Sequence, residues 1–161
     1  MPTNVRLYRS EDFESVWPLF AQVSRFYRDT DVPSAERVRT YVKDEVLGEG
    51  SGIRLALAFL DQTPAGLATF AILHPGPGTT GQLYLKELFV RKEHRGKGAG
   101  RAIMKFLARY ALKEGCSRFD WTGETTNPQG LKFYRALGIA PATEKVCFRL
   151  SGKALEQFAN S

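Results

Sequence analysis

The fold is decided by the stretch Arg95-Gly96-Lys97-Gly98-Ala99-Gly100-Arg101. It follows an apolar run from Leu83 to Val90 that is typical of a strand, and it opens a helical pattern from Ala99 to Gly115. In a turn of this kind, glycines let backbone N–H groups close around an anion, and the helix N-terminus adds its dipole. Lys and Arg side chains complete the charge match. The stretch therefore predicts a phosphate-binding turn.

Two well-known phosphate motifs do not fit this turn. A Walker loop needs Gly-x-x-x-x-Gly-Lys-Ser/Thr, which the stretch lacks. A dinucleotide fingerprint needs Gly-x-Gly-x-x-Gly, but Arg101 stands where its last glycine would fall. The chain does contain Gly-x-Gly-x-x-Gly at 76–81, but this run leads into a strand, so we interpret it as a loop. A solvated basic turn before a helix remains the alternative.

The arrangement that remains, Arg-x-x-Gly-x-Gly between a strand and a helix, resembles the pyrophosphate loop of the GCN5-related N-acetyltransferases, which bind acetyl-coenzyme A. A second segment is similar to a later motif of the same family, in which an Asn precedes a short helix that ends in Phe-Tyr and a glycine turn. That segment runs Asn127-Pro128-Gln129-Gly130-Leu131-Lys132-Phe133-Tyr134-Arg135-Ala136-Leu137-Gly138. The two motifs cover the middle and last thirds of the chain. The part from Gly115 to Ala159 looks like the branch that acetylates small diamines.

The length of 161 residues suits a single N-acetyltransferase domain over 1–161. The net charge is +6, and much of the basic excess lies between Lys86 and Arg118, where one polyphosphate cofactor would account for it. We therefore expect no nucleic-acid partner. The sequence has neither an apolar run near the ~18 residues of a membrane span nor an N-terminal signal pattern. We expect no membrane association, no metal, two buried reduced thiols at Cys116 and Cys147, and a cytoplasmic location.

Hydrophobic periodicity predicts an α/β (α+β) fold, with a mixed sheet covered by helices. The expected strands are Val5–Tyr8, Ile53–Leu60, Gly66–Leu73, Gln82–Val90, Arg118–Thr122 and Lys145–Ser151. The expected helices run from Ser10 to Tyr27, from Pro33 to Leu47, from Ala99 to Gly115, from Pro128 onward, and from Lys153 to Ala159. The resemblance implies a mostly antiparallel central sheet. It also implies a bulge in the strand before the phosphate turn, and a splayed strand pair that receives the pantetheine arm.

The resemblance also assigns roles to residues. Tyr134 matches the tyrosine that the family places near the thioester sulfur. In that role its hydroxyl would protonate the leaving thiolate. The alternative is that Tyr134 is a core residue without a catalytic role. Backbone N–H groups of Leu88, Phe89 and Val90 would stabilise the oxyanion. The expected cofactor-binding residues are Leu88, Phe89, Val90, Arg95, Gly96, Lys97, Gly98, Ala99, Gly100, Arg101 and Asn127.

The general base is less obvious. The family often places a carboxylate on the strand before the turn, and the corresponding positions here are Tyr84 or Lys86. Glu87 is adjacent, but one residue along a strand reverses the face unless a bulge restores it. We predict Glu87 as a catalytic residue on that condition. Glu124 or ordered water are alternatives, and His74 is interpreted as a loop residue.

Together these features predict a transferase that moves acetyl from acetyl-coenzyme A to a primary amine of a small molecule, by direct transfer in a ternary complex. Lys86 would attract a carboxylate, which favours an amino acid or peptide, whereas the C-terminal similarity favours a diamine. The alternatives are a catalytically weak acyl-coenzyme A-binding regulatory module, an acetyltransferase for protein amines, and a basic nucleic-acid-binding domain. A tail strand and helix that could pair across an interface leave a homodimer open.

Overall fold

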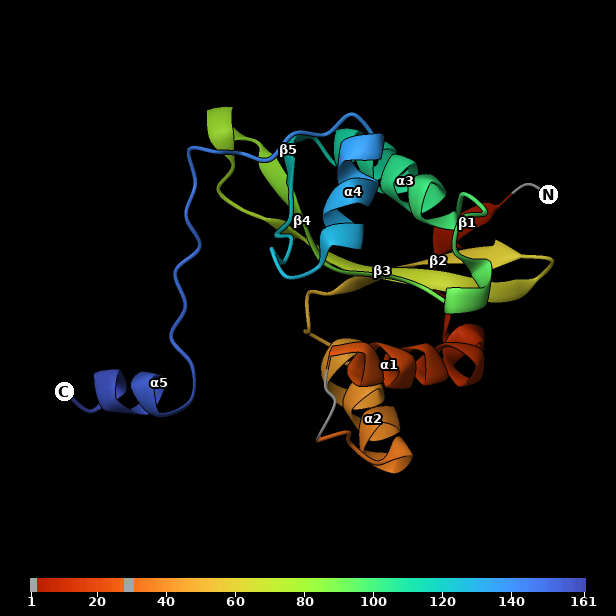
Figure 1. The fold of residues 1–161 in the computed structure, drawn as a ribbon, viewed down its shortest axis with the longest axis horizontal. Helices are drawn as coiled ribbons and strands as arrows, with labels where there is room; N and C mark the ends of the chain where they lie inside the picture. The colour runs from red at the N-terminus through yellow and green to blue at the C-terminus, as the bar shows by residue number, and fades with distance from the viewer. Residues whose placement is uncertain (1–2, 28–30) are drawn as a thin grey trace. The chain divides into compact units, whose positions relative to one another are not determined.

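A computed structural model describes residues 3–27 and 31–161. The chain divides into two compact units, residues 1–122 and residues 123–161. Figure 1 shows the first unit as a central sheet with helices on its faces, and the second as two short helices joined by an extended segment.

The first unit is built on a five-stranded sheet with the order β1-β2-β3-β4-β5. The first four strands pair antiparallel with one another, whereas β5 runs parallel to β4. The residues Asp61 and Gln62, which join β2 to β3, both have positive φ, as a tight two-residue hairpin turn requires. The predicted mixed, mostly antiparallel sheet is therefore confirmed. Its strands are β1 Asn4–Leu7, β2 Arg54–Leu60, β3 Thr63–Leu73, β4 Gly81–Val90 and β5 Cys116–Asp120.

Helices cover both faces of this sheet (Figure 1). On one face lies α1, Phe13–Tyr27, with α2, Ala35–Tyr41, which continues into a π-helical turn, η2, Val42–Val46. On the other face lies α3, Ala99–Lys113, whose Tyr110 ring meets Phe70 of β3 at 5.3 Å between centroids. Three short 3₁₀ turns complete the unit: η1 Ser10–Asp12, η3 Pro77–Thr79 and η4 Lys92–His94.

The core under α1 joins that helix to three strands. Its buried members come from every third or fourth residue of the helix and from alternate residues of the strands, as the two periodicities require. They are Val16, Leu19, Val23, Leu55, Leu57, Leu67 and Phe89. Because Phe89 belongs to this cluster, the end of β4 packs against α1.

An ion pair ties β1 to the start of α1. The buried carboxylate of Asp12 accepts hydrogen bonds from Nη1 and Nη2 of Arg6, both at 2.7 Å, and from the backbone N–H of Arg9 at 2.8 Å. The hydrogen bonds from Arg6 are the largest cause that lowers the pKa of Asp12.

The second unit contains α4, Pro128–Ala136, and α5, Gly152–Ala159. The Oδ1 of Asn127 caps α4 by accepting from the Gly130 N–H at 3.0 Å. The strand predicted over Lys145–Ser151 is wrong, because in the described part of the chain this segment pairs with no other strand. Apolar alternation alone does not supply the neighbouring edge that a strand needs. The predicted burial of Cys147 is wrong for the same reason, whereas Cys116 is buried.

Candidate active site

The phosphate-binding turn predicted from the sequence has the backbone of an anion site. Gly96 and Gly98 have φ of 73° and 87°, a region that side-chain-bearing residues avoid. Gly98 is the N-cap of α3 and offers no side-chain acceptor. The first turn of hydrogen bonds begins with the Ala102 N–H, which donates to the Gly98 carbonyl at 2.9 Å. The amides of Ala99 and Gly100 therefore precede the helical hydrogen-bond pattern and point out of the positive end of the helix.

Arg95 anchors this turn to its surroundings. Its Nε donates to the Val90 carbonyl at 3.0 Å, and its guanidinium lies 5.5 Å from the centroid of the Phe26 ring. The turn is thus joined to the end of β4 and to the last turn of α1. Lys97 and Arg101 place further positive charge beside it.

One edge of β4 is open toward the turn. The pairing of β4 with β5 covers Gly81–Tyr84 only, so β4 splays from β5 beyond that point, as the resemblance implies. The Arg91 N–H donates to the Ala65 carbonyl of β3 at 2.9 Å. Because backbone groups alternate between the two edges of a strand, those of Val90 and Leu88 point to the open edge, and those of Phe89 point to β3. Two of the three predicted oxyanion donors, Leu88 and Val90, are therefore suitably oriented.

A bulge at Lys86 decides the orientation of Glu87. Leu85 pairs with Phe70 and Glu87 with Thr69, so Lys86 is an extra residue in β4. Without it, Glu87 would share the face of Leu85, which lies on the side of α3. With it, Glu87 lies on the side of α1, the same face as Tyr84. The condition on which the sequence predicted Glu87 is therefore met.

Glu87 is half-buried and bonded to α1. The hydroxyl of Tyr27 donates to Oε1 of Glu87 at 3.1 Å. Burial is the largest influence on the pKa of Glu87 and raises it; the Tyr27 hydrogen bond and the charge of Lys86 act in the opposite direction. A carboxylate whose pKa is raised toward neutrality is suited to accept a proton from an ammonium substrate.

The Tyr27–Glu87 contact was missed by the sequence analysis. From the sequence alone, Phe20, Phe26 and Tyr27 of the first helix could line an acceptor pocket or belong to the core, and the core is the favoured interpretation for the aromatic stripe. In the structure Phe20 packs against the core, whereas Phe26 and Tyr27 are 49% and 54% exposed. The signal available in the sequence was the pair of adjacent aromatic residues, Phe26 and Tyr27, at the end of the helical pattern.

The remaining predicted residues lie in the second unit or in loops. Tyr134 is half-buried in α4, and its ring meets that of Phe133 edge-on at 5.2 Å. Asn127 caps that helix, and Glu124, exposed, precedes it. His74 follows β3, as expected of a loop residue. The structure thus brings together Val90, Arg95, Phe26, Tyr27 and Glu87.

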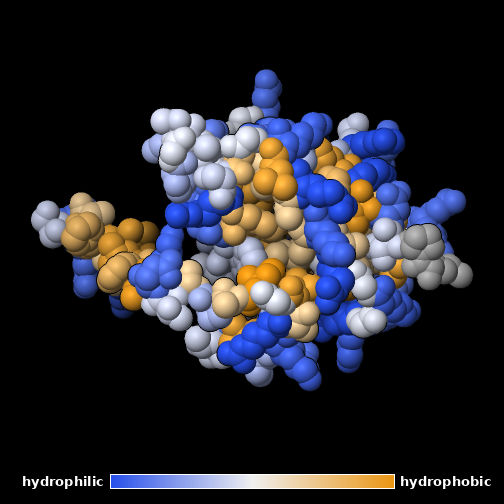
Figure 2. Space-filling view, turned by 90° about the horizontal axis from the view of Figure 1, so that it is seen from above, coloured by the Kyte–Doolittle hydropathy of each residue, from blue (hydrophilic) through white to orange (hydrophobic). Residues whose placement is uncertain are grey.

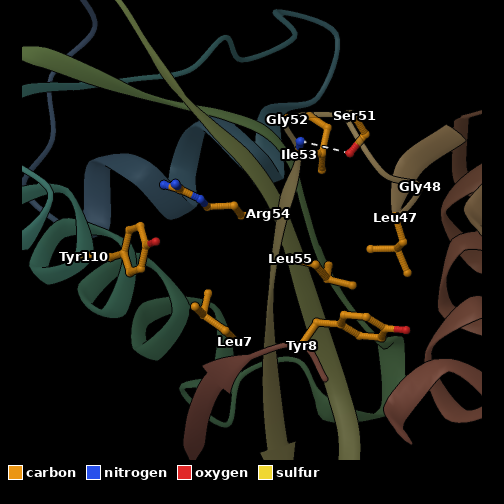
Figure 3. A pocket seen from close by; sticks show the side chains of 11 residues that line it. Leu7, Tyr8, Leu47, Gly48, Ser51, Gly52, Ile53, Arg54, Leu55 and Tyr110 are labelled. Atoms are coloured by element: carbon orange, nitrogen blue, oxygen red, sulfur yellow. Dashed lines mark hydrogen bonds between the residues drawn. The ribbon is translucent and has the colours of Figure 1, made fainter. Parts of the chain in front are cut away.

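A cavity of about 390 Å³ lies elsewhere (Figure 3). It is formed by the end of β1, the loop before β2 and Tyr110, which is near the C-terminal end of α3. The phosphate turn precedes the other end of that helix, and no predicted site residue lines the cavity. Arg54 at its wall lies 3.6 Å from the Glu114 carboxylate and 5.5 Å from the Tyr110 ring centroid. Most of the predicted site residues lie instead along β4 and in the turn that follows it.

The described residues contain neither a cluster of metal ligands nor a helix that could cross a membrane. Within 3–27 and 31–161, His, Cys, Asp and Glu side chains nowhere gather in threes to hold a metal ion. None of the helices in those ranges combines the length and apolar character needed to cross a membrane.

Curated proteins similar to this chain are named N-acetyltransferases. The chain is 36% identical over 80 residues to the thialysine N-epsilon-acetyltransferase of Bos taurus, covering 48% of this chain and 47% of that protein. It is 29% identical over 96 residues to the L-ornithine N5-acetyltransferase NATA1 of Arabidopsis thaliana, covering 60% and 42%. The chain thus spans about half the length of these curated relatives.

Solved structures extend the similarity to the whole chain. The integron cassette protein VCH_CASS6 of V. cholerae superposes with a TM-score of 0.92 and 34% identity, over 100% of this chain and 99% of that one. The aminoglycoside acetyltransferase AAC(6')-Iy, with a TM-score of 0.73 and 17% identity over 94% and 100% of the chains, shares the fold. The model of the acetyltransferase (GNAT) family matches residues 14–139, the greater part of the sequence. With the turn, the bulge and the splayed strand in place, the chain belongs to the GNAT family of N-acetyltransferases.

Proposed function

We propose that this protein transfers acetyl from acetyl-coenzyme A to the distal amine of a small amino-acid-like molecule, directly and in a ternary complex. The observation that carries the proposal is the position of Glu87. The bulge at Lys86 turns this carboxylate to the α1 face of β4, the strand whose open edge leads into the phosphate turn. A base, oxyanion donors and a phosphate anchor therefore follow one another along the chain.

The residues of the turn fit acetyl-coenzyme A. If a Cβ were added at Gly96 or Gly98, no atom beyond the neighbouring residues would lie within 4 Å of it. The backbone is therefore open to a ligand at both glycines. The residues that would hold the pyrophosphate are Arg95, Gly96, Lys97, Gly98, Ala99, Gly100 and Arg101. Acetyl-coenzyme A would supply an activated acetyl group as its thioester. Asn127, which caps α4, remains a proposed contact that rests on the family motif.

Each step of the reaction has a candidate group. Glu87 would take the proton from the acceptor ammonium, since the protonated amine has no lone pair with which to attack. The amides of Leu88 and Val90 would donate to the developing oxyanion. Tyr134 would return a proton to the leaving thiolate, a role that rests on the family motif.

The acceptor is proposed from the names of the relatives and from Lys86. Thialysine and ornithine each carry a side-chain amine and a carboxylate. Such a molecule satisfies both expectations from the sequence. Its side-chain amine agrees with the similarity of the C-terminal part to the branch that acetylates small diamines, and its carboxylate would be attracted by Lys86. The side chain of Lys86 is exposed, directly before Glu87. We therefore expect Glu87 to receive the amine and Lys86 to attract the acid group.

A charge-reversal experiment tests this assignment. Lys86→Glu should lower kcat/KM for ornithine and lysine relative to a simple diamine such as 1,4-diaminobutane. Lys105→Glu, at an exposed position of α3, is the matched control and should leave the ratio unchanged. An unchanged ratio in Lys86→Glu would remove Lys86 from recognition. Including a peptide amine in the panel tests the protein-acetyltransferase alternative.

One observation favours a second candidate, a regulatory module that binds acyl-coenzyme A with little catalysis. Tyr84 and Lys86 occupy the positions where the family often has its carboxylate. Calorimetric titration with acetyl-coenzyme A, followed by an amine panel, separates the two candidates. Binding without turnover of any amine would favour the module. A cytoplasmic location stays part of the proposal and rests on the two cysteines, which form no disulfide.

A further inference from the structure

Two adjacent aromatic residues, Phe26 and Tyr27, end α1 at the surface. Both are about half exposed, whereas the core cluster takes Val16, Leu19 and Val23 from the same helix. Exposed apolar side chains are ordinary on this protein, since Figure 2 shows hydrophobic atoms among hydrophilic ones on the visible face. What distinguishes Phe26 is therefore not its exposure but the set of partners that its ring contacts.

The Phe26 ring contacts two neighbours. The guanidinium of Arg95 lies 5.5 Å from its centroid, within the range of a cation–π contact. The Tyr27 ring meets it at 5.1 Å between centroids with the planes at 89°, the edge-to-face geometry that aromatic pairs prefer. The Tyr27 hydroxyl then donates to Oε1 of Glu87 at 3.1 Å. Contacts thus run without a break from the phosphate turn to the proposed base.

Arg95 is held at two points. Its Nε donates to the Val90 carbonyl at 3.0 Å, and the Phe26 ring supports the guanidinium. A guanidinium has five N–H groups, so the four on the two Nη atoms can still bind a phosphate. The two contacts therefore restrict how the side chain turns and leave its Nη end available to a ligand.

We propose that Phe26 is a positioning residue for both halves of the site, because its ring holds Arg95 in the phosphate turn and Tyr27 against Glu87. The proposal rests on the proposed function, which assigns acetyl-coenzyme A to the turn and the proton to Glu87. Phe26 acts through its two neighbours and not on the reacting atoms. An aliphatic side chain would fill similar space, but it offers no ring to the guanidinium or to Tyr27.

Direct charge does not make this connection. The groups that act on the Glu87 carboxyl are Lys86 beside it on β4 and the Tyr27 hydroxyl from α1. Its partner across the strand pair, on β3, is the uncharged Thr69. The route from Arg95 to Glu87 is consequently one of ring contacts.

Calorimetric titration with acetyl-coenzyme A tests the connection to Arg95. Phe26→Leu should weaken binding roughly two- to fivefold, the usual size of an exposed cation–π contact. Phe26→Tyr, which keeps the ring, should bind as the wild type does. In the Arg95→Met background, Phe26→Leu should cause no further loss, because the partner of the ring is gone. Tyr41→Leu is the matched control, since Tyr41 ends α2 and is 58% exposed.

A carbon NMR titration of the side-chain carboxyl groups tests the connection to the base and needs no turnover. The Glu87 signal is assigned by its absence from Glu87→Gln. The Tyr27 hydroxyl lowers the pKa of Glu87, so a loosened Tyr27 should raise that pKa in Phe26→Leu, by less than in Tyr27→Phe. Phe26→Tyr and Tyr41→Leu should leave the Glu87 pKa at its wild-type value.

The outcomes separate this proposal from the proposed function. A wild-type protein that binds no acetyl-coenzyme A would overturn both. If the wild type binds it, three results would each overturn the positioning role alone: equal affinities of Phe26→Leu and Tyr41→Leu, an equal loss with and without Arg95, or an unchanged Glu87 pKa in Phe26→Leu. Lack of turnover with any amine would contradict the proposed activity, while both titrations still decide the role of Phe26.

Discussion

Replacing Glu87 by Gln tests the proposed base most specifically. The change keeps the shape and an acceptor for the Tyr27 hydroxyl but removes the proton-accepting carboxylate. General acid–base groups contribute about 10²–10⁴-fold to the rate, so kcat/KM should fall by that factor at neutral pH. The affinity for acetyl-coenzyme A should be retained, because Glu87 lies outside the phosphate turn.

Tyr27→Phe provides a graded comparison. The 3.1 Å hydrogen bond to Glu87 joins two solvent-accessible groups, so its net value is about 0.5–1 kcal/mol, or roughly two- to fivefold in rate. The Tyr27 hydroxyl lowers the pKa of Glu87, so its removal should raise that pKa. The acidic limb of the profile of kcat/KM against pH should therefore move to higher pH in Tyr27→Phe, and should be absent from Glu87→Gln.

A stability measurement controls for misfolding. Because burial raises the pKa of Glu87, the native state binds more protons than the unfolded state between the ordinary and the raised pKa. The contribution of Glu87 to the free energy of unfolding is thus present at low pH and is lost as the pH rises through the raised pKa. Glu87→Gln should consequently melt no lower than the wild type at pH 7. A Gln variant that is folded and retains wild-type turnover, with its acidic limb intact, would refute the base assignment.

Three further predictions concern the fold, the turn and the proton donor. Asp12→Asn should lower the free energy of unfolding by about 2–3 kcal/mol at pH 7, because it weakens the hydrogen-bonded ion pair between the buried Asp12 carboxylate and the partly exposed Arg6. In urea titrations the difference should disappear as the pH falls through the lowered pKa of Asp12; a constant difference would contradict the ionic origin. Gly98→Ala and Gly115→Ala should each cost about 1–2 kcal/mol, since both glycines have positive φ and open space around a Cβ. Calorimetry should show weaker acetyl-coenzyme A binding in Gly98→Ala only; equal losses would remove the turn from the site. Tyr134→Phe should reduce turnover by roughly 10²–10⁴-fold with little change in melting temperature, and wild-type rates would exclude the assigned role.

The features that were predictable from the sequence are those with a local cause. Strands and helices of the first unit follow from apolar periodicity, and the turn at 95–101 follows from its glycines and charges. The contact between Tyr27 and Glu87 joins residues 60 positions apart, and no local pattern encodes it. The side of the sheet that Glu87 occupies depends on a bulge, which is a property of two paired strands.

The wrong predictions share a physical reason. The segment 145–151 has the alternation of a strand, and Cys147 was therefore expected to be buried. Pairing and burial both need a neighbouring edge, and within the described chain the segment has none. A sequence pattern shows which secondary structure a segment prefers. Which strand the segment pairs with depends on the rest of the fold.

The most direct test of the proposed activity is the product formed from acetyl-coenzyme A and ornithine. Purified full-length protein would be incubated with both, and released coenzyme A and acetylated products would be quantified by mass spectrometry. The proposed function predicts equal amounts of free coenzyme A and of ornithine acetylated on its side-chain amine, at a rate that falls about 10²–10⁴-fold in Glu87→Gln. Tight binding of acetyl-coenzyme A without acetylation of ornithine, or of any other amine, would contradict it.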